Sequence, residues 1–179
     1  MTSVSTPAIL VFVALSLGIA YRSRASLRDP ASHGFYRFFA FESLLALVVI
    51  NVSAWFRDPL STPQLASWIL LLTSAFLAVR GFTVLHREGK PSASFETTTV
   101  LVTSGVYRYI RHPLYASLLY FGWGVFFKDP SLVSGALVLG ASGFLFLTAK
   151  AEETENLSKF GTAYAVHMET TKRFIPFVF

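Results

Sequence analysis

Long uncharged apolar runs dominate the hydropathy pattern of the chain. The first has its apolar centre at residues 8–21, the second spans about 36–56 and the third about 65–85. Their apolar residues come in blocks rather than at amphipathic spacing, which is typical of helices buried on every side, and the blocks approach the length needed to cross a bilayer. The pattern therefore predicts a three-helix N-terminal part in residues 1–85.

Two further apolar segments, 113–127 and 131–149, are joined by the short turn Lys128-Asp129-Pro130. A connection this short predicts a tight hairpin of the fourth and fifth helices. The first of these segments rises only about 22 Å as a helix, less than the roughly 30 Å of the hydrocarbon core. We therefore expect the fourth helix to start before Pro113, to sit in a thinned bilayer or to stop short.

The chain turns polar after residue 150, but apolar residues still recur on one helical face, and Gly161 interrupts them. This spacing predicts a cytosolic C-terminal helical cap in two pieces that lies against the membrane. The residues of this apolar face are Leu157, Phe160, Tyr164 and Met168.

The expected fold is all-α, a polytopic membrane protein of about five transmembrane helices in a single domain, 1–179.

Composition agrees with a membrane protein, since 53% of the residues are hydrophobic and only 14% are charged. Cysteine is absent, which excludes a disulfide framework, a thiolate nucleophile and a cysteine-based metal centre, and we expect no metal site. Arg22, Arg24 and Arg28 follow the first apolar run, whereas a signal peptide carries its bases in front. The first run is therefore interpreted as a retained spanning helix.

The net charge of +5 is divided among short loops and does not line one face, so a nucleic-acid partner is not expected. Basic residues are frequent after the first helix, in the long loop 86–112 and in the tail, and sparse in the other two loops. By the positive-inside rule, the N-terminus lies outside and the C-terminus in the cytosol, together with the long loop.

The two most polar segments, 103–115 and 152–176, are separated in sequence by the hairpin, which returns the chain to the same face of the membrane. They should therefore meet there. Together they supply paired carboxylates, a histidine, tyrosines and arginines, a set that suits a zwitterionic ligand. Taken singly, the bases Arg108 and Arg111 are typical headgroup anchors, and Glu152 with Glu153 is typical of a solvated face.

The order of these residues carries a resemblance. Gly105-x-Tyr107-x-x-x-Arg111-His112-Pro113-x-Tyr115, then Glu152-Glu153, then Phe160-Gly161-x-x-Tyr164 and a terminal Arg173-x-x-Pro176, resembles the isoprenylcysteine carboxyl methyltransferase family and its phospholipid methyltransferase relatives. The match covers about 99–179. The resemblance implies a five-helix membrane enzyme that transfers a methyl group from S-adenosylmethionine, bound under the cap, to a lipophilic or prenylated acceptor that enters between helices.

The resemblance also implies site residues in the part 86–179. Glu152 and Arg173 would be catalytic, and the cofactor contacts would be Thr99, Val100, Leu101, Val102, Tyr107, His112, Pro113, Leu114, Tyr115 and Glu152.

One position departs from the family pattern. Members that methylate a prenylcysteine carboxylate typically carry an arginine where this chain has Thr148, and Lys150 or Arg173 would have to replace it. The acceptor is therefore left open between an isoprenylcysteine-like carboxylate and another lipid or isoprenoid.

Two other functions stay in competition. One is an NADPH-dependent membrane reductase of the sterol-reductase type, and the other is a non-catalytic membrane scaffold. A soluble Rossmann methyltransferase is excluded because no glycine-rich dinucleotide loop is present.

The membrane would be the plasma or inner membrane in a prokaryote and the endoplasmic reticulum in a eukaryote. Glu42, an acidic residue inside an apolar run, either faces the bundle interior or pairs with Arg37 at the cytoplasmic mouth.

Overall fold

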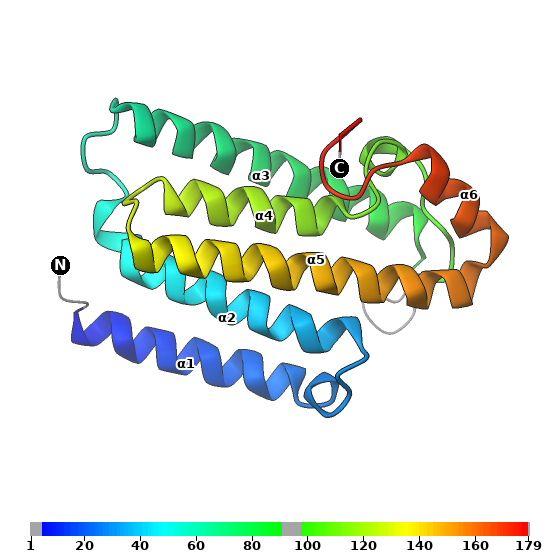
Figure 1. Ribbon diagram of the computed structural model, residues 1–179, viewed down its shortest axis with the longest axis horizontal. Helices are drawn as coiled ribbons and strands as arrows, with labels where there is room; N and C mark the ends of the chain where they lie inside the picture. The colour runs from blue at the N-terminus through cyan, green and yellow to red at the C-terminus, as the bar shows by residue number, and fades with distance from the viewer. Residues whose placement is uncertain (1–4, 91–97, 179) are drawn as a thin grey trace.

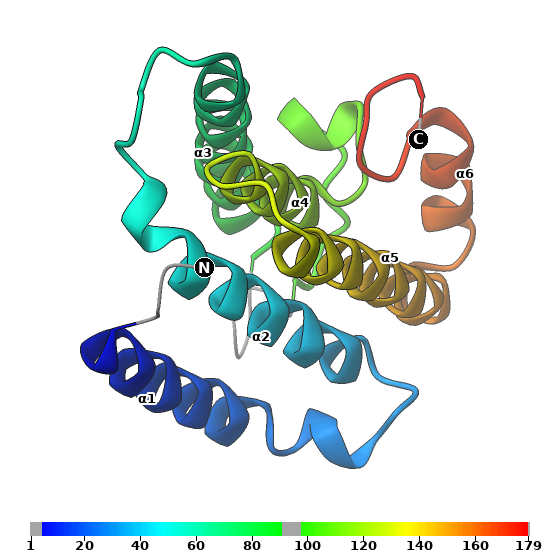
Figure 2. The ribbon, with the colours of Figure 1, turned by 60° about the vertical axis from the view of Figure 1, so that its left-hand side comes forward.

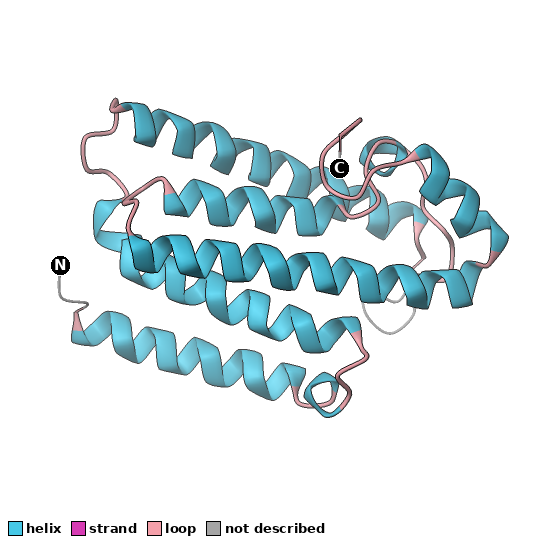
Figure 3. Ribbon diagram, viewed as in Figure 1, coloured by secondary structure: helices cyan, strands magenta, loops and turns pink. Residues whose placement is uncertain are grey.

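The fold is helical throughout the part of the chain that the computed structural model describes, residues 5–90 and 98–178 (Figures 1 and 3). None of these residues forms a strand, although an isolated parallel bridge joins Ile110 to Lys172. The all-α prediction is confirmed. Pro91 and Thr97, which the sequence places in the long loop, lie outside the described residues. The elements are α1 (Thr6–Ser23), η1 (Ser26–Arg28), α2 (His33–Asn51), η2 (Val52–Ala54), α3 (Thr62–Glu88), η3 (Gly105–Arg108), α4 (Pro113–Phe126), α5 (Leu132–Phe160) and α6 (Thr162–Thr170).

The long helices lie side by side, with α4 and α5 between α3 and α2, and α1 on the outer side of α2 (Figures 1 and 2). The predicted hairpin of α4 and α5 is present. A core cluster forms where α2, α4 and α5 meet, from Leu47, Val125 and Val138. In contrast, no residue of α1 is buried, so this helix presents its apolar side chains to the surroundings of the protein.

Four of the described helical segments are long and apolar enough to cross a membrane, namely α1, α2 with η2, α3 and α5. The fifth expected span corresponds to α4, which has 14 residues and therefore rises only about 21 Å. Of the three possibilities considered for this helix, a start before Pro113 is wrong, because α4 begins at Pro113, and the other two stay predictions. The chain is a membrane protein, and the number of five crossings stays a prediction.

Helix α5 is longer than expected. The hydropathy pattern ends the fifth span at residue 149, but the helix continues without a break to Phe160 and carries the first piece of the cap. Gly161 then ends it with a φ of 55°, a backbone conformation that glycine adopts without strain, and α6 follows as the second piece. The change from apolar to polar residues near residue 150 therefore does not mark the end of α5.

Close packing of α4 depends on two glycines. A Cβ atom at Gly124 would lie 2.9 Å from Leu71 Cγ of α3, and one at Gly122 would lie 2.8 Å from Leu44 Cδ2 of α2. Both distances are far below van der Waals contact, so a larger residue would force Leu44 to move at Gly122 and would crowd the side chain and backbone of Leu71 at Gly124. These glycines let α4 approach α3 on one side and α2 on the other.

A buried polar network closes the end of the bundle that carries the turn between α4 and α5. Lys128 is buried, its Nζ donates to Gln64 Oε1 at 2.9 Å, and it lies 3.4 Å from the centre of the Trp68 ring. Gln64 Nε2 donates in turn to the carbonyls of Ala54 and Lys128, at 3.0 and 3.2 Å. The single amide of Gln64 thus ties α3 to η2 and to the hairpin turn.

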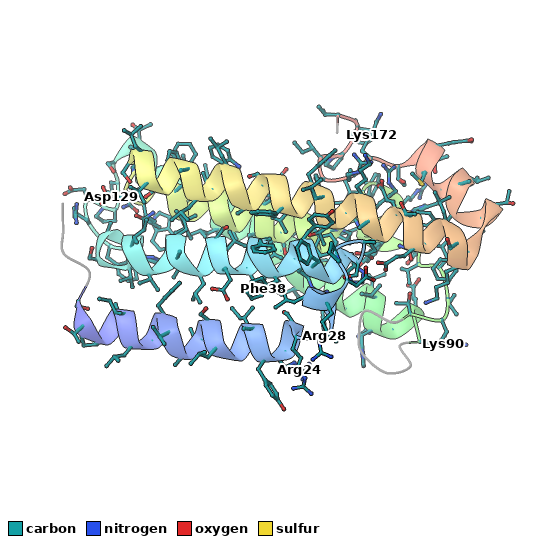
Figure 4. All side chains as sticks on the ribbon, turned by 60° about the horizontal axis from the view of Figure 1, so that its bottom comes forward. Arg24, Arg28, Phe38, Lys90, Asp129 and Lys172 are labelled. Carbon is teal, nitrogen blue, oxygen red and sulfur yellow. The ribbon has the colours of Figure 1, made fainter. Side chains whose placement is uncertain are left out.

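The two ends of the bundle differ in charge. Figure 4 places Arg24, Arg28, Lys90 and Lys172 together at one end and Asp129 at the other. The end that is rich in bases is also the end where α6 lies, as Figure 1 shows. The loops that the charge pattern assigns to one face therefore do lie at one end of the molecule.

We predict that Gln64→Leu lowers the free energy of unfolding by about 1–3 kcal/mol, because the buried Lys128 ammonium loses its acceptor and the Ala54 carbonyl loses its donor. Lys128→Met should cost less, since it removes the charge as well. Thermal unfolding in detergent measures both, with the exposed Lys150→Met as control. Equal transition midpoints for Gln64→Leu and Lys150→Met would contradict the role of the network.

Candidate active site

A cavity of about 540 Å³ opens at the end of the bundle that carries α6. This is the size of a site for a small organic ligand. Its walls come from α2, α3, the segment around η3, the start of α4, the end of α5 and α6. The two polar segments that the sequence pattern expects to meet therefore both reach this cavity.

The wall formed by the long helices is apolar. Ala78, Val79 and Phe82 contribute it from α3, Phe41 from α2 and Leu118 from α4. Val79 and Phe82 line the cavity and are 64% and 47% exposed. Because α3 is a candidate membrane span, we expect this side of the cavity to face lipid.

The opposite wall is polar and is built around Glu153. This buried carboxylate receives Arg111 Nε at 2.9 Å and Arg173 Nε at 3.0 Å on one oxygen, and Arg173 Nη2 at 2.6 Å on the other. His112 Nε2 lies 3.4 Å from the first oxygen. A buried charge is tolerated when it is paired and hydrogen-bonded, and two guanidinium groups meet that need here.

The C-terminal segment is strapped to the residues before α4. Arg111 and His112 donate backbone N–H bonds to the carbonyls of Lys172 and Arg173, at 2.8 and 3.2 Å, and Lys172 N donates to the Tyr109 carbonyl at 3.2 Å. The Arg111 guanidinium also donates to the carbonyls of Met168, at 3.0 Å, and Thr171. These bonds, called the strap below, hold the turn at His112, called the histidine turn, against the C-terminal segment, although some sixty residues separate the two.

Glu152 faces a different direction from Glu153, because adjacent helical residues point about 100° apart. Glu152 lines the cavity with its side chain 31% exposed, and none of the hydrogen bonds among described residues uses it. The nearest charged partner is His112, whose Nδ1 lies 4.0 Å from Glu152 Oε2. His112 is 3% exposed and stacks on Tyr115, with ring centres 5.5 Å apart. Glu152 is thus the carboxylate of this site with oxygens free to bind a ligand.

Burial sets the protonation of the aromatic residues in this wall. Burial, and then the nearby Glu152 charge, raises the pKa of Tyr107, and burial raises the pKa of Tyr164 to about 12, so both hydroxyls stay protonated. Burial, followed by the positive charges of Arg111 and His112, lowers the pKa of His167 below its ordinary value. The cavity therefore contains hydroxyl donors and a histidine held neutral.

Most of the residues implied by the resemblance line the cavity, but three do not. Thr99 and Val100 are exposed and donate their N–H groups to the Gly89 carbonyl, so they fasten the loop to the end of α3. Arg173 is held by Glu153 and is not part of the cavity wall. The residues that do line it are Leu101, Val102, Tyr107, His112, Pro113, Leu114, Tyr115 and Glu152.

Sequence reasoning missed several lining residues. Asn156 lies one helical turn after Glu152, and His167 lies three residues after Tyr164, so helical spacing points to both. Thr98 lines the cavity in place of Thr99. The apolar residues on α2 and α3 carry no such signal, because any apolar residue of a membrane helix looks alike in sequence. Arg37, from α2, lines the same cavity.

We predict that Glu153→Gln lowers the free energy of unfolding by about 3–5 kcal/mol, because both guanidinium groups lose their counter-charge while still buried. Proteolysis should then cut the segment after α6 faster than in the parent. Thermal unfolding and timed digestion measure the two effects. Glu169→Gln, on an exposed residue of α6, is the matched control, and a Glu153→Gln protein as stable as this control would refute the role of the ion pair.

Comparison with known proteins adds the family. Residues 63–167, more than half of the chain, match the family model described as phospholipid methyltransferase. The chain is also 26% identical over 162 residues to methanethiol S-methyltransferase 1 of Bradyrhizobium diazoefficiens, an alignment that covers 82% of the chain. It spans 55% of the length of that relative. The matched region contains the α4–α5 hairpin and nearly all of the cavity wall, and the chain belongs to the phospholipid methyltransferase family.

Proposed function

We propose that this protein transfers a methyl group from S-adenosylmethionine to a lipophilic acceptor. The observation that carries the proposal is a single cavity with two unlike walls, one apolar and open toward lipid, the other polar with an accessible carboxylate. Membership of the family supports methyl transfer as the reaction.

The polar wall suits the donor. Glu152 offers its carboxylate to the donor's ammonium group, Leu101 and Val102 offer an apolar surface to adenine, and Asn156 offers an amide to hydrogen-bond it. Tyrosine rings such as that of Tyr164 attract a sulfonium by cation–π contact, worth about 0.5–2 kcal/mol each. The ammonium, adenine and sulfonium groups of the donor thus each find a partner of suitable chemistry among the lining residues.

The bound donor would supply a methyl group that is already activated. The protein then has to align the acceptor with it and keep water out, effects that provide up to about 7–11 kcal/mol. Phe82 and Leu118 in the apolar wall would hold the acceptor, and the strapped histidine turn would hold the polar wall at a fixed distance from it. No covalent enzyme intermediate is needed.

A neutral nucleophile is favoured over a carboxylate as the acceptor. Thr148, at the position of the family arginine, is fully buried and donates its hydroxyl to the Phe144 carbonyl. Neither replacement base lines the cavity, since Arg173 is held by Glu153 and Lys150 is exposed. The relative from Bradyrhizobium is named for a thiol substrate. We therefore propose a lipophilic thiol as the acceptor.

The charge pattern supports an orientation. The cavity lies at the end of the bundle that carries Arg24, Arg28 and Lys172 (Figure 4), and basic loops are retained on the cytoplasmic side. We propose that the cavity faces the cytosol, where a water-soluble donor reaches the polar wall while the acceptor arrives through lipid.

We predict that S-adenosylhomocysteine binds the purified protein and that Glu152→Gln weakens the binding about 10- to 100-fold, the loss expected for a hydrogen bond to a charged group. Calorimetry in detergent measures both, with Glu169→Gln as control. Tight binding of NADPH without binding of S-adenosylhomocysteine would instead support the reductase. If neither ligand bound, the scaffold function would be favoured.

We predict that dodecanethiol accepts label from methyl-labelled S-adenosylmethionine in proteoliposomes and that dodecanoate does not. The two probes share a chain and differ in the reacting group, so the comparison tests whether the protein methylates a thiol in preference to a carboxylate. Extraction followed by mild base separates the products, because a methyl ester releases its label and a thioether keeps it. Base-labile label from dodecanoate would overturn the choice of a thiol.

A further inference from the structure

We propose that His167 is the general base that removes the proton from the thiol acceptor. The inference rests on the proposed function and adds a catalytic residue to it. His167 belongs to α6, lines the cavity, and lies beside Tyr164, with ring centres 6.1 Å apart.

The ring of His167 is available to a ligand. The hydrogen bonds that His167 makes with described residues use its backbone carbonyl, which accepts from the hydroxyls of Thr170 and Thr171. None of them uses a ring nitrogen. The residue is 7% exposed and is one of those that line the cavity. A group bound in the cavity therefore meets an imidazole whose nitrogens are not already engaged.

The other titratable groups of the cavity are less suited to this task. His112 points one nitrogen toward Glu153 at 3.4 Å and the other toward Glu152 at 4.0 Å, and its ring is covered by Tyr115. Arg111 is a cation, and the tyrosine hydroxyls stay protonated. A carboxylate such as Glu152 is a poor match for a thiol, because their ordinary pKa values, about 4.3 and 8.5, differ widely.

The surroundings of His167 keep it ready to accept a proton at neutral pH. The charged and titratable groups facing it are Arg111 and His112, from the segment before α4, and Tyr164 on its own helix. Burial first, and then the electrostatic effect of Arg111 and His112, lowers its pKa below the ordinary 6.5. The imidazole is therefore neutral above that pH.

The S–H proton moves to a ring nitrogen of His167, and the sulfur lone pair forms the new bond to the methyl carbon. The bond between that carbon and the donor sulfur breaks, and its electron pair returns to the donor sulfur. The positive charge lost by the donor reappears on the imidazolium, and the products are a methyl thioether and S-adenosylhomocysteine.

A first test needs no turnover. Diethylpyrocarbonate acylates neutral, accessible imidazoles, and mass spectrometry locates the label. We expect label on His167 and on the exposed His86, but not on His112, and we expect S-adenosylhomocysteine to protect His167 without protecting His86. Absence of label from His167 while His86 reacts would overturn the proposal, as would label that the bound ligand does not reduce.

A second test uses the pH dependence of dodecanethiol methylation by His167→Gln. A positioned base contributes about 10²- to 10⁴-fold, so we expect a loss of that size at pH 7. The loss should shrink as pH rises toward the thiol pKa near 8.5, because the free thiolate needs no base. The parent rate should instead stay level at neutral pH and fall only at pH values below the ordinary histidine pKa of 6.5, because the lowered pKa of His167 delays its protonation.

The controls separate this inference from the function on which it rests. His86→Gln should behave like the parent. A His167→Gln protein that binds S-adenosylhomocysteine and methylates dodecanethiol at the parental rate would refute the base alone. A pH-independent loss would assign His167 a structural role and also refute it. Failure of the parent to bind S-adenosylhomocysteine would refute the proposed function itself.

Discussion

The ion pair at Glu153 is the interaction on which the site depends. One buried carboxylate is shared by Arg111, which precedes α4, and by Arg173, which follows α6. A buried ion pair adds little net stability compared with apolar residues of the same size. It does restrict the arrangement of the chain, because any arrangement that separates the charges leaves one of them buried without a partner. It therefore specifies one arrangement of three segments that lie far apart in the sequence. The backbone strap between Arg111 and Lys172 follows the same alignment, and the cavity lies directly beside it.

Unequal helix lengths then make the space for a ligand. Helix α4 has 14 residues and begins at the cavity, whereas α3 with 27 and α5 with 29 continue past it on either side. The two long neighbours form walls above the start of the short helix, and the chain before α4 and the cap fill the remaining sides. The glycines of α4 keep this helix close to α3 and α2, so the cavity narrows to a packed core toward the other end.

The membrane helices could largely be predicted from the sequence, because long apolar runs are typical of them. The starts of α3 and α4 coincide with Pro63 and Pro113, whose fixed φ and missing N–H suit a first helical turn. The end of α5 was missed, since most of its last eleven residues are polar and the change in hydropathy does not interrupt the helix. In the site, motif order identified His112, Tyr107 and Glu152, which line the cavity. Thr99 and Arg173 do not line the cavity, because sequence order does not show which way a loop residue points or with which carboxylate an arginine pairs.

If the acceptor enters past the exposed Val79 and Phe82, as proposed, its effective concentration is the one in the bilayer and not the one in water. An acceptor that arrives sideways is first dissolved in the bilayer, so its local abundance follows its partition coefficient. Each methylene gains about 0.8 kcal/mol on leaving water for the membrane, which is close to a fourfold enrichment. Long-chain compounds would thus outcompete short ones before any contact with protein, and turnover measured against total aqueous concentration would report bilayer solubility as much as recognition.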